Sequence, residues 1–143
     1  MERKLIIRNF GAIASADIAL KDFNIFIGEQ GAGKSTVAKL ITIFENSRDK
    51  VLKVDSDYLM TKFSEYNIIS YFNPDSYISY SSEQGDITYE DGSFNFTFSY
   101  HSTSHNLYIP AERFFISTFS RSIATLVLSK APIPVTLLEF ASF

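Results

Sequence analysis

A glycine-rich stretch, FNIFIGEQGAGKST at residues 23–36, holds the side chains of this sequence whose types and spacing are best suited to chemistry. Gly28, Gly33, Lys34 and Ser35 occupy the fixed positions of the pattern G-x-x-x-x-G-K-[ST]. Glycines let the backbone curl until several N–H groups point at one anion, and a following helix adds its free N–H groups and the positive end of its dipole. The pattern predicts a phosphate-binding loop (Walker A motif), with Lys34 on the β- and γ-phosphates and Ser35 as a ligand of Mg²⁺.

The residues on both sides of this loop have the periodicity that a phosphate-binding loop needs. Phe23, Ile25 and Ile27 alternate as in a strand, and a predicted helix at residues 35–46 repeats its apolar positions every three to four residues. This context argues against a chance match. We therefore predict ATP and Mg²⁺ as cofactors, bound by the residues of the whole loop: Gly28, Glu29, Gln30, Gly31, Ala32, Gly33, Lys34, Ser35 and Thr36.

Composition limits the classes of protein that the chain can belong to. The length of 143 residues suits one domain, and 45% hydrophobic residues are ordinary for a globular protein. The formal net charge of −3 divides into +2 over residues 1–62 and −5 over residues 63–143, so no strong basic field for nucleic acid is present. The chain has no cysteine, which excludes disulfides and thiolate metal sites. No stretch resembles a signal peptide or a membrane span, so we expect a soluble, cytoplasmic protein without membrane contact.

The remaining pattern predicts a mixed α/β chain. Two strands joined by short turns, expected to be antiparallel, precede the strand that enters the loop. A second helix at residues 58–72 ends at Asn73-Pro74-Asp75, and the period then changes to two, with an Asp91-Gly92 hairpin signal. The predicted strands are residues 5–10, 16–20, 23–27, 77–81, 86–89, 94–100 and 107–110. We divide this single lobe into a phosphate-binding core (1–57), a helix with a β-rich insertion (58–105) and a final segment of strand and helices (106–143).

At this point the sequence resembles a known family. The order LIIRNFGAI at residues 5–13, the Ala16-Asp17-Ile18 strand and the glycine-rich loop together resemble the start of SMC/RecF/OLD-like ABC-type ATPase heads. The later LYIPAER at residues 107–113 is similar to a segment of bacterial OLD-like ATPases. Residues 1–45 carry the resemblance well and residues 105–115 more loosely. One departure is Gln30, where SMC-type heads usually have Asn.

The resemblance implies a fold and further site residues. It implies an α/β P-loop NTPase fold, the N-terminal half of an ABC-type ATPase head, with a mixed sheet and an antiparallel β-rich subdomain. Arg8 and Asn9, with Phe10, would lie beside the base and ribose, and Glu112 would face the γ-phosphate as a catalytic residue together with Lys34. In such a family the complete assembly would serve DNA maintenance or phage defence, with DNA and a nuclease as possible partners.

The chain lacks motifs that complete such a head. We find no signature Ser-Gly-Gly-Gln-like loop, no apolar run that ends in Asp-Glu and no switch histidine. The resemblance therefore implies a lobe that is either truncated before its second half or completed by a second ATPase half or by self-association, with the apolar residues 135–143 as part of the docking surface. It also implies that the chain alone hydrolyses little ATP. Two alternatives remain open: a non-catalytic, nucleotide-dependent interaction module, and a small P-loop kinase or GTPase, which the two strands before the loop disfavour.

Overall fold

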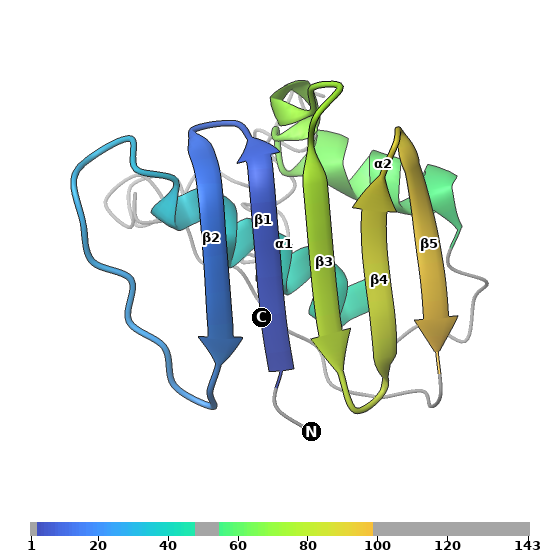
Figure 1. Cartoon of the computed structure of the whole chain (residues 1–143), viewed down its shortest axis with the longest axis horizontal. Helices are drawn as coiled ribbons and strands as arrows, with labels where there is room; N and C mark the ends of the chain where they lie inside the picture. Colours follow the sequence, from blue (N-terminus) through green and yellow to red (C-terminus); the bar gives the residue numbers. More distant parts are fainter. Residues whose placement is uncertain (1–2, 48–54, 99–143) are drawn as a thin grey trace, which may run out of the picture. The chain divides into compact units, whose positions relative to one another are not determined.

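A single antiparallel sheet forms the framework of the part of the chain that the structure describes. The computed structural model describes residues 3–47 and 55–98, all of which lie within one compact unit, Met1–Asn106. Five strands follow the spatial order β2-β1-β3-β4-β5, and every neighbouring pair is antiparallel (Figure 1). The strands are β1 (Arg3–Phe10), β2 (Ile13–Leu20), β3 (Tyr77–Ser82), β4 (Gly85–Glu90) and β5 (Ser93–Phe98).

In the described residues, the sheet is antiparallel throughout, and the predicted mixed sheet with an antiparallel β-rich subdomain stays a prediction for the whole lobe. β1 pairs with β3 along its whole middle, with Leu5 opposite Tyr80 and Ile7 opposite Ile78, so the early hairpin and the later strands share one sheet. All four of these side chains are fully buried. Because the register places them on one face, the two parts of the sequence bury a common core. Periodicity identifies each strand, but it does not specify which distant strand becomes its neighbour.

The hairpin turns follow from local sequence. The two-residue turn between β4 and β5 has Asp91 at φ +50° and Gly92 at φ +77°, the pair of left-handed conformations that a type I′ turn requires. The β3–β4 turn consists of Glu83 and Gln84, because Ser82 pairs with Gly85. Both hairpins and the antiparallel β1–β2 pair confirm the sequence-based expectation.

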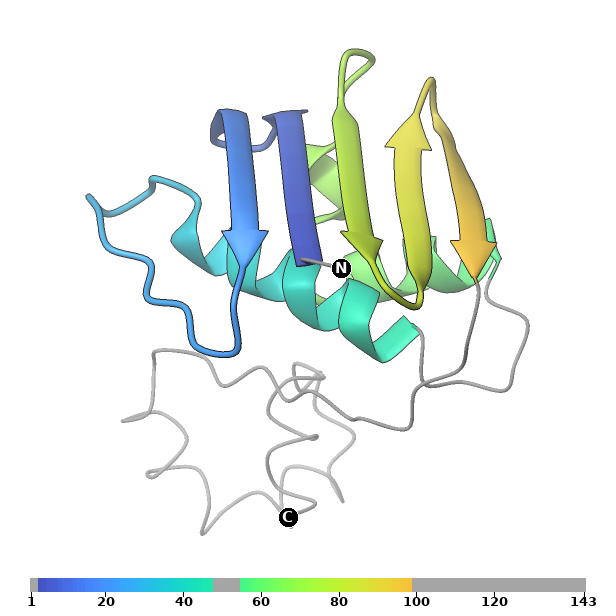
Figure 2. The same ribbon diagram turned by 60° about the horizontal axis from the view of Figure 1, so that its bottom comes forward.

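Two α-helices, α1 (Lys34–Ser47) and α2 (Ser56–Glu65), cover the same face of the sheet. Figure 2 shows α1 running along that face across β2, β1 and β3. Its predicted apolar stripe is the buried one, comprising Val37, Leu40, Ile43 and Phe44.

Helix α2 begins at a regular cap and ends earlier than predicted. Asp55 is its N-cap, and the Asp55 carboxylate accepts a hydrogen bond of 2.9 Å from the Tyr58 backbone N–H. The predicted helix at residues 58–72 is interrupted because Asn67 adopts φ +55°, which ends a right-handed helix. A short 3₁₀ helix, η1 (Ile69–Tyr71), follows.

An aromatic cluster fills the space between the helices and the sheet. The Phe63 ring from α2 lies with its centroid 5.9 Å from that of Phe10, 4.9 Å from Phe72 and 5.7 Å from Phe94. Phe44 from α1 lies 6.1 Å from Phe63 and 5.7 Å from Tyr80. These contacts join both helices to β1, β3 and β5, so the sheet and helices stabilise one another. Phe94 is buried and belongs to this core.

Candidate functional site

The segment that leads into the glycine-rich loop is not a strand. Residues 21–33 run as a loop from β2 to α1, and Figure 1 shows this loop curving away from the edge of β2. Phe23, Ile25 and Ile27 are 80%, 71% and 90% exposed. The predicted strand at residues 23–27 is therefore wrong for the described part of the chain, because no described segment provides a hydrogen-bonding neighbour for it. Its alternating apolar pattern is present, but among residues 3–47 and 55–98 no strand pairs with it.

The glycine-rich loop has the backbone curvature that its sequence predicts. Gly28, Gly31 and Gly33 have φ values of +156°, +83° and +86°, a region that residues with a Cβ rarely adopt. The Ala32 backbone N–H donates to the Glu29 carbonyl at 3.3 Å, and the Val37 N–H donates to the Gly33 carbonyl at 2.9 Å, where α1 begins. The loop therefore turns directly into the first turn of α1.

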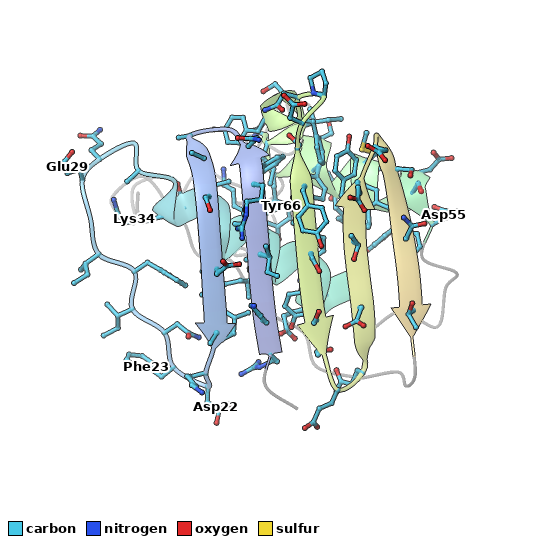
Figure 3. All side chains as sticks on the ribbon, viewed as in Figure 1. Asp22, Phe23, Glu29, Lys34, Asp55 and Tyr66 are labelled. Atoms are coloured by element: carbon cyan, nitrogen blue, oxygen red, sulfur yellow. The ribbon has the colours of Figure 1, made fainter. Side chains whose placement is uncertain are left out.

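Lys34 folds back over this loop. Its Nζ donates to the carbonyl oxygens of Gly28, at 2.9 Å, and of Glu29, at 2.5 Å. Figure 3 labels Lys34 at the start of α1 and Glu29 on the loop that precedes it. The ammonium group therefore lies against the backbone of the loop. A phosphate bound by this loop would contact it.

The start of α1 is electrostatically suited to an anion. The first turn contains no acidic residue, and the first N–H groups of a helix have no acceptor within the helix. Ser35 is exposed, so its hydroxyl is accessible to a metal ion, whereas Thr36 is buried. This arrangement can hold a phosphate on backbone N–H groups and leaves one hydroxyl available for Mg²⁺.

Ile13 supports the loop from the sheet and was not identified from the sequence. A Cβ atom added to Gly33 would lie 2.5 Å from Ile13 Cγ1 and 3.0 Å from Ile13 Cδ1. The first residue of β2 therefore packs directly on the backbone of the loop. Ile13 is buried at the start of a strand, as many core isoleucines are, so no local sequence signal distinguishes it.

Arg8 and Asn9 already have protein partners. Arg8 forms an ion pair with Asp17 at 2.9 Å, and it donates to the carbonyl oxygens of Ile7 and Ala16. Asn9 donates through Nδ2 to the Asp75 carbonyl at 3.4 Å. Their contact with a base and ribose stays a prediction. Phe10, which was expected beside them at the nucleotide, is fully buried in the aromatic cluster and is a core residue.

Charged residues contact one another at the entry to the loop. Arg3 forms an ion pair of 3.1 Å with Asp22, just before the exposed segment, and one of 3.5 Å with Glu45 on α1. Glu45 is buried, and it also accepts a hydrogen bond from the Tyr80 hydroxyl. The contacts of Arg3 thus connect Asp22, at the start of the loop, to Glu45, near the C-terminal end of α1.

The remaining predicted site residue, Glu112, lies outside the described residues, as does the apolar segment 135–143. Within residues 3–47 and 55–98, no group of three His, Cys, Asp or Glu side chains could hold a metal ion. No helix in this part of the chain is long and apolar enough to cross a membrane.

Comparison with known families gives one match. A family model described as "AAA ATPase domain" matches residues 1–127 of the 143. No curated protein and no solved structure matches the chain. The matched region contains the whole described sheet, both helices and the glycine-rich loop.

The contact between Gly33 and Ile13 can be tested by its effect on stability. Gly33→Ala and Gly31→Ala both place a Cβ at positive φ, a strain of about 1–3 kcal/mol, but only Gly33→Ala also meets Ile13, since nothing lies within 4 Å at Gly31. We expect Gly33→Ala to lower the free energy of unfolding by about 1–3 kcal/mol more than Gly31→Ala, measured by urea denaturation without nucleotide. Replacing Ile13 by Ala in the Gly33→Ala background should make the two losses less than additive. Equal losses for the two glycine variants would refute the contact.

Proposed function

The chain belongs to the AAA ATPase domain family, and from this membership we propose that it binds ATP with Mg²⁺ through residues 28–36. The observation that carries the proposal is the curled loop with Lys34 folded over it at the start of α1. In this proposal the backbone N–H groups of the loop and of the first turn of α1 hold the phosphates. Lys34 neutralises charge on the β- and γ-phosphates, and Ser35 ligates the metal.

The finer assignment is the N-terminal lobe of an SMC/OLD-like head. The order of elements supports it, because an antiparallel pair, β1 and β2, precedes the loop, and β3, β4 and β5 follow α1. A small P-loop kinase or GTPase, which usually begins with the strand of the loop, fits this order less well. We propose that the complete assembly acts in DNA maintenance or phage defence, where DNA and a nuclease are the partners that the resemblance implies.

Catalysis requires groups in addition to the loop. ATP hydrolysis needs a side chain that orients the attacking water and donors that neutralise the transferring phosphoryl group. The described loop supplies backbone N–H and ammonium donors, and no side chain among the described residues is assigned to orient the water. We therefore propose that a second ATPase half or partner chain supplies the missing groups, with Glu112 as the first candidate within this chain. A non-catalytic module that binds nucleotide to control an interaction is the second candidate function, and the same shortage of catalytic groups favours it.

Nucleotide binding is tested by removing the ammonium group of the loop. Lys34→Ala should weaken MgATP binding by about 10- to 100-fold, because a charge-assisted hydrogen bond to phosphate is lost. Isothermal titration calorimetry on the full chain gives the affinity. The matched control is Lys62→Ala, since Lys62 lies on α2 and pairs with Glu65. If Lys34→Ala bound MgATP as tightly as the parent and the control, the assignment of the loop would be wrong.

Hydrolysis is tested on the same purified chain. Because positioning and electrostatics carry nearly all of phosphoryl transfer, we expect turnover at or near the uncatalysed rate without a second half. Phosphate release is measured for the parent and for Lys34→Ala, which excludes a contaminating ATPase. Robust turnover that Lys34→Ala abolishes would show that an acid already present in the chain is sufficient, and Glu112→Gln would then identify or exclude Glu112.

The exposed segment 23–27 supports a proposal about partners. Three large, exposed apolar side chains on a segment that has no strand partner among the described residues favour pairing with a strand of another polypeptide, either a second copy of this chain or a second ATPase half. Ile25→Lys should therefore reduce concentration-dependent association in sedimentation velocity. Ile69→Lys is the matched control, because Ile69 is an exposed isoleucine on η1, outside this segment. A parent that stays monomeric contradicts self-association and leaves the second half as the partner.

A further inference from the structure

We propose that residues 71–76, which we name the turn clamp, set the position of the phosphate-binding loop through the β1–β2 turn and Ile13, and that Ser76 and Asn73 are positioning residues for the nucleotide. The proposal rests on the proposed nucleotide binding and adds residues that do not touch the loop themselves. Its basis is a continuous series of contacts from the turn clamp to Gly33.

The series begins with hydrogen bonds to one carbonyl group. The Asn9 carbonyl oxygen accepts from Ser76 Oγ and from Asn73 Nδ2, each at 2.6 Å. Ser76 is buried, and its hydroxyl also accepts from the Asn73 backbone N–H at 2.9 Å. Two short bonds that converge on one oxygen fix the end of β1 in a single place.

The β1–β2 turn itself has little freedom to move. Asn9 and Gly11 are both left-handed, at φ +50° and +56°. The Gly11 N–H donates to the Tyr71 carbonyl at 3.1 Å, and a Cβ on Gly11 would lie 2.6 Å from the Tyr71 ring. Phe10, between them, is held in the core with its ring 5.8 Å from that of Tyr71 and 4.9 Å from that of Phe72.

The last step connects the turn to the loop. Phe10 pairs with Ile13 across the hairpin, and Ile13 packs against Gly33 closely enough to exclude a methyl group there. Gly33 is the residue from which α1 starts, since its carbonyl accepts from Val37. A shift of the turn would therefore move Ile13 against the backbone whose N–H groups are proposed to hold phosphate, and closely packed groups transmit such shifts.

The test uses Ser76→Ala, its conservative counterpart Ser76→Thr and a matched control, Ser93→Ala. The Ser93 hydroxyl makes the same kind of bond, to the Glu90 carbonyl at 3.2 Å, in the β4–β5 turn. We expect Ser76→Ala to weaken MgATP binding about 3- to 10-fold, Ser76→Thr to retain most of the affinity, and Ser93→Ala to leave it unchanged. The unfolding midpoint of each variant is measured alongside, so that a general loss of stability is recognised.

Two further measurements separate positioning from simple stabilisation. In an Ile13→Val background, Ser76→Ala should weaken binding by less than about twofold, because the route to Gly33 is already altered. Without nucleotide, Ser76→Ala should accelerate amide hydrogen exchange at residues 31–34, whereas Ser93→Ala should not. Equal weakening in both backgrounds, or unchanged exchange in the loop, would overturn the proposal. A parent that fails to bind MgATP would refute the proposed function instead, and the exchange measurement would still decide the positioning role.

Discussion

The double pairing of β1 is the constraint on which the rest of the described structure depends. A strand with neighbours on both edges has its backbone N–H and C=O groups bonded on both sides, which is what an interior position in a sheet requires. β1 is bonded to β2 on one edge and to β3 on the other. The hairpin on the first edge leads into the glycine-rich loop, and the strands on the second edge supply the surface on which α2 packs. β1 therefore links the packing of β3, β4 and β5 to the hairpin that leads into the loop.

The elements that could be predicted from the sequence are those that local chemistry specifies. The Asp91-Gly92 turn, the apolar stripe of α1 and the glycine-rich loop each depend on residues a few positions apart. The shared sheet could not be predicted, because the pairing of Ile7 with Ile78 joins positions far apart in the sequence whose apolar character suits many neighbours. The end of α2 at Glu65, just before the left-handed Asn67, could not be predicted for a related reason, since the apolar period continues through residues that no longer lie on this helix.

The candidate site shows the same division between local and distant determinants. Lys34, Gly28 and Gly33 are identified by their spacing alone, and the backbone of the two glycines has the curvature that the spacing implies. Ile13, by contrast, is important because of what it touches, and a buried isoleucine at the start of a strand gives no local indication of that. The same holds for Ser76, whose hydroxyl holds a carbonyl 67 positions earlier in the chain. Residues that position a site are therefore harder to find from sequence than residues that contact its ligand.

The hydrogen bonds of Lys34 indicate how the loop can be ordered before a ligand arrives. An ammonium group has three N–H donors, and two of them are directed at the carbonyl oxygens of Gly28 and Glu29. The partial negative charge of these carbonyl oxygens would oppose an anion bound close to them. With the ammonium group bonded to them, their charge is compensated and one donor remains for a phosphate oxygen. Because a charge-assisted bond to phosphate is stronger than one to a neutral carbonyl, a nucleotide can either add to this arrangement or exchange with part of it. The loop is therefore held in a curled form by the same side chain that would bind the phosphate, which lowers the ordering cost of binding.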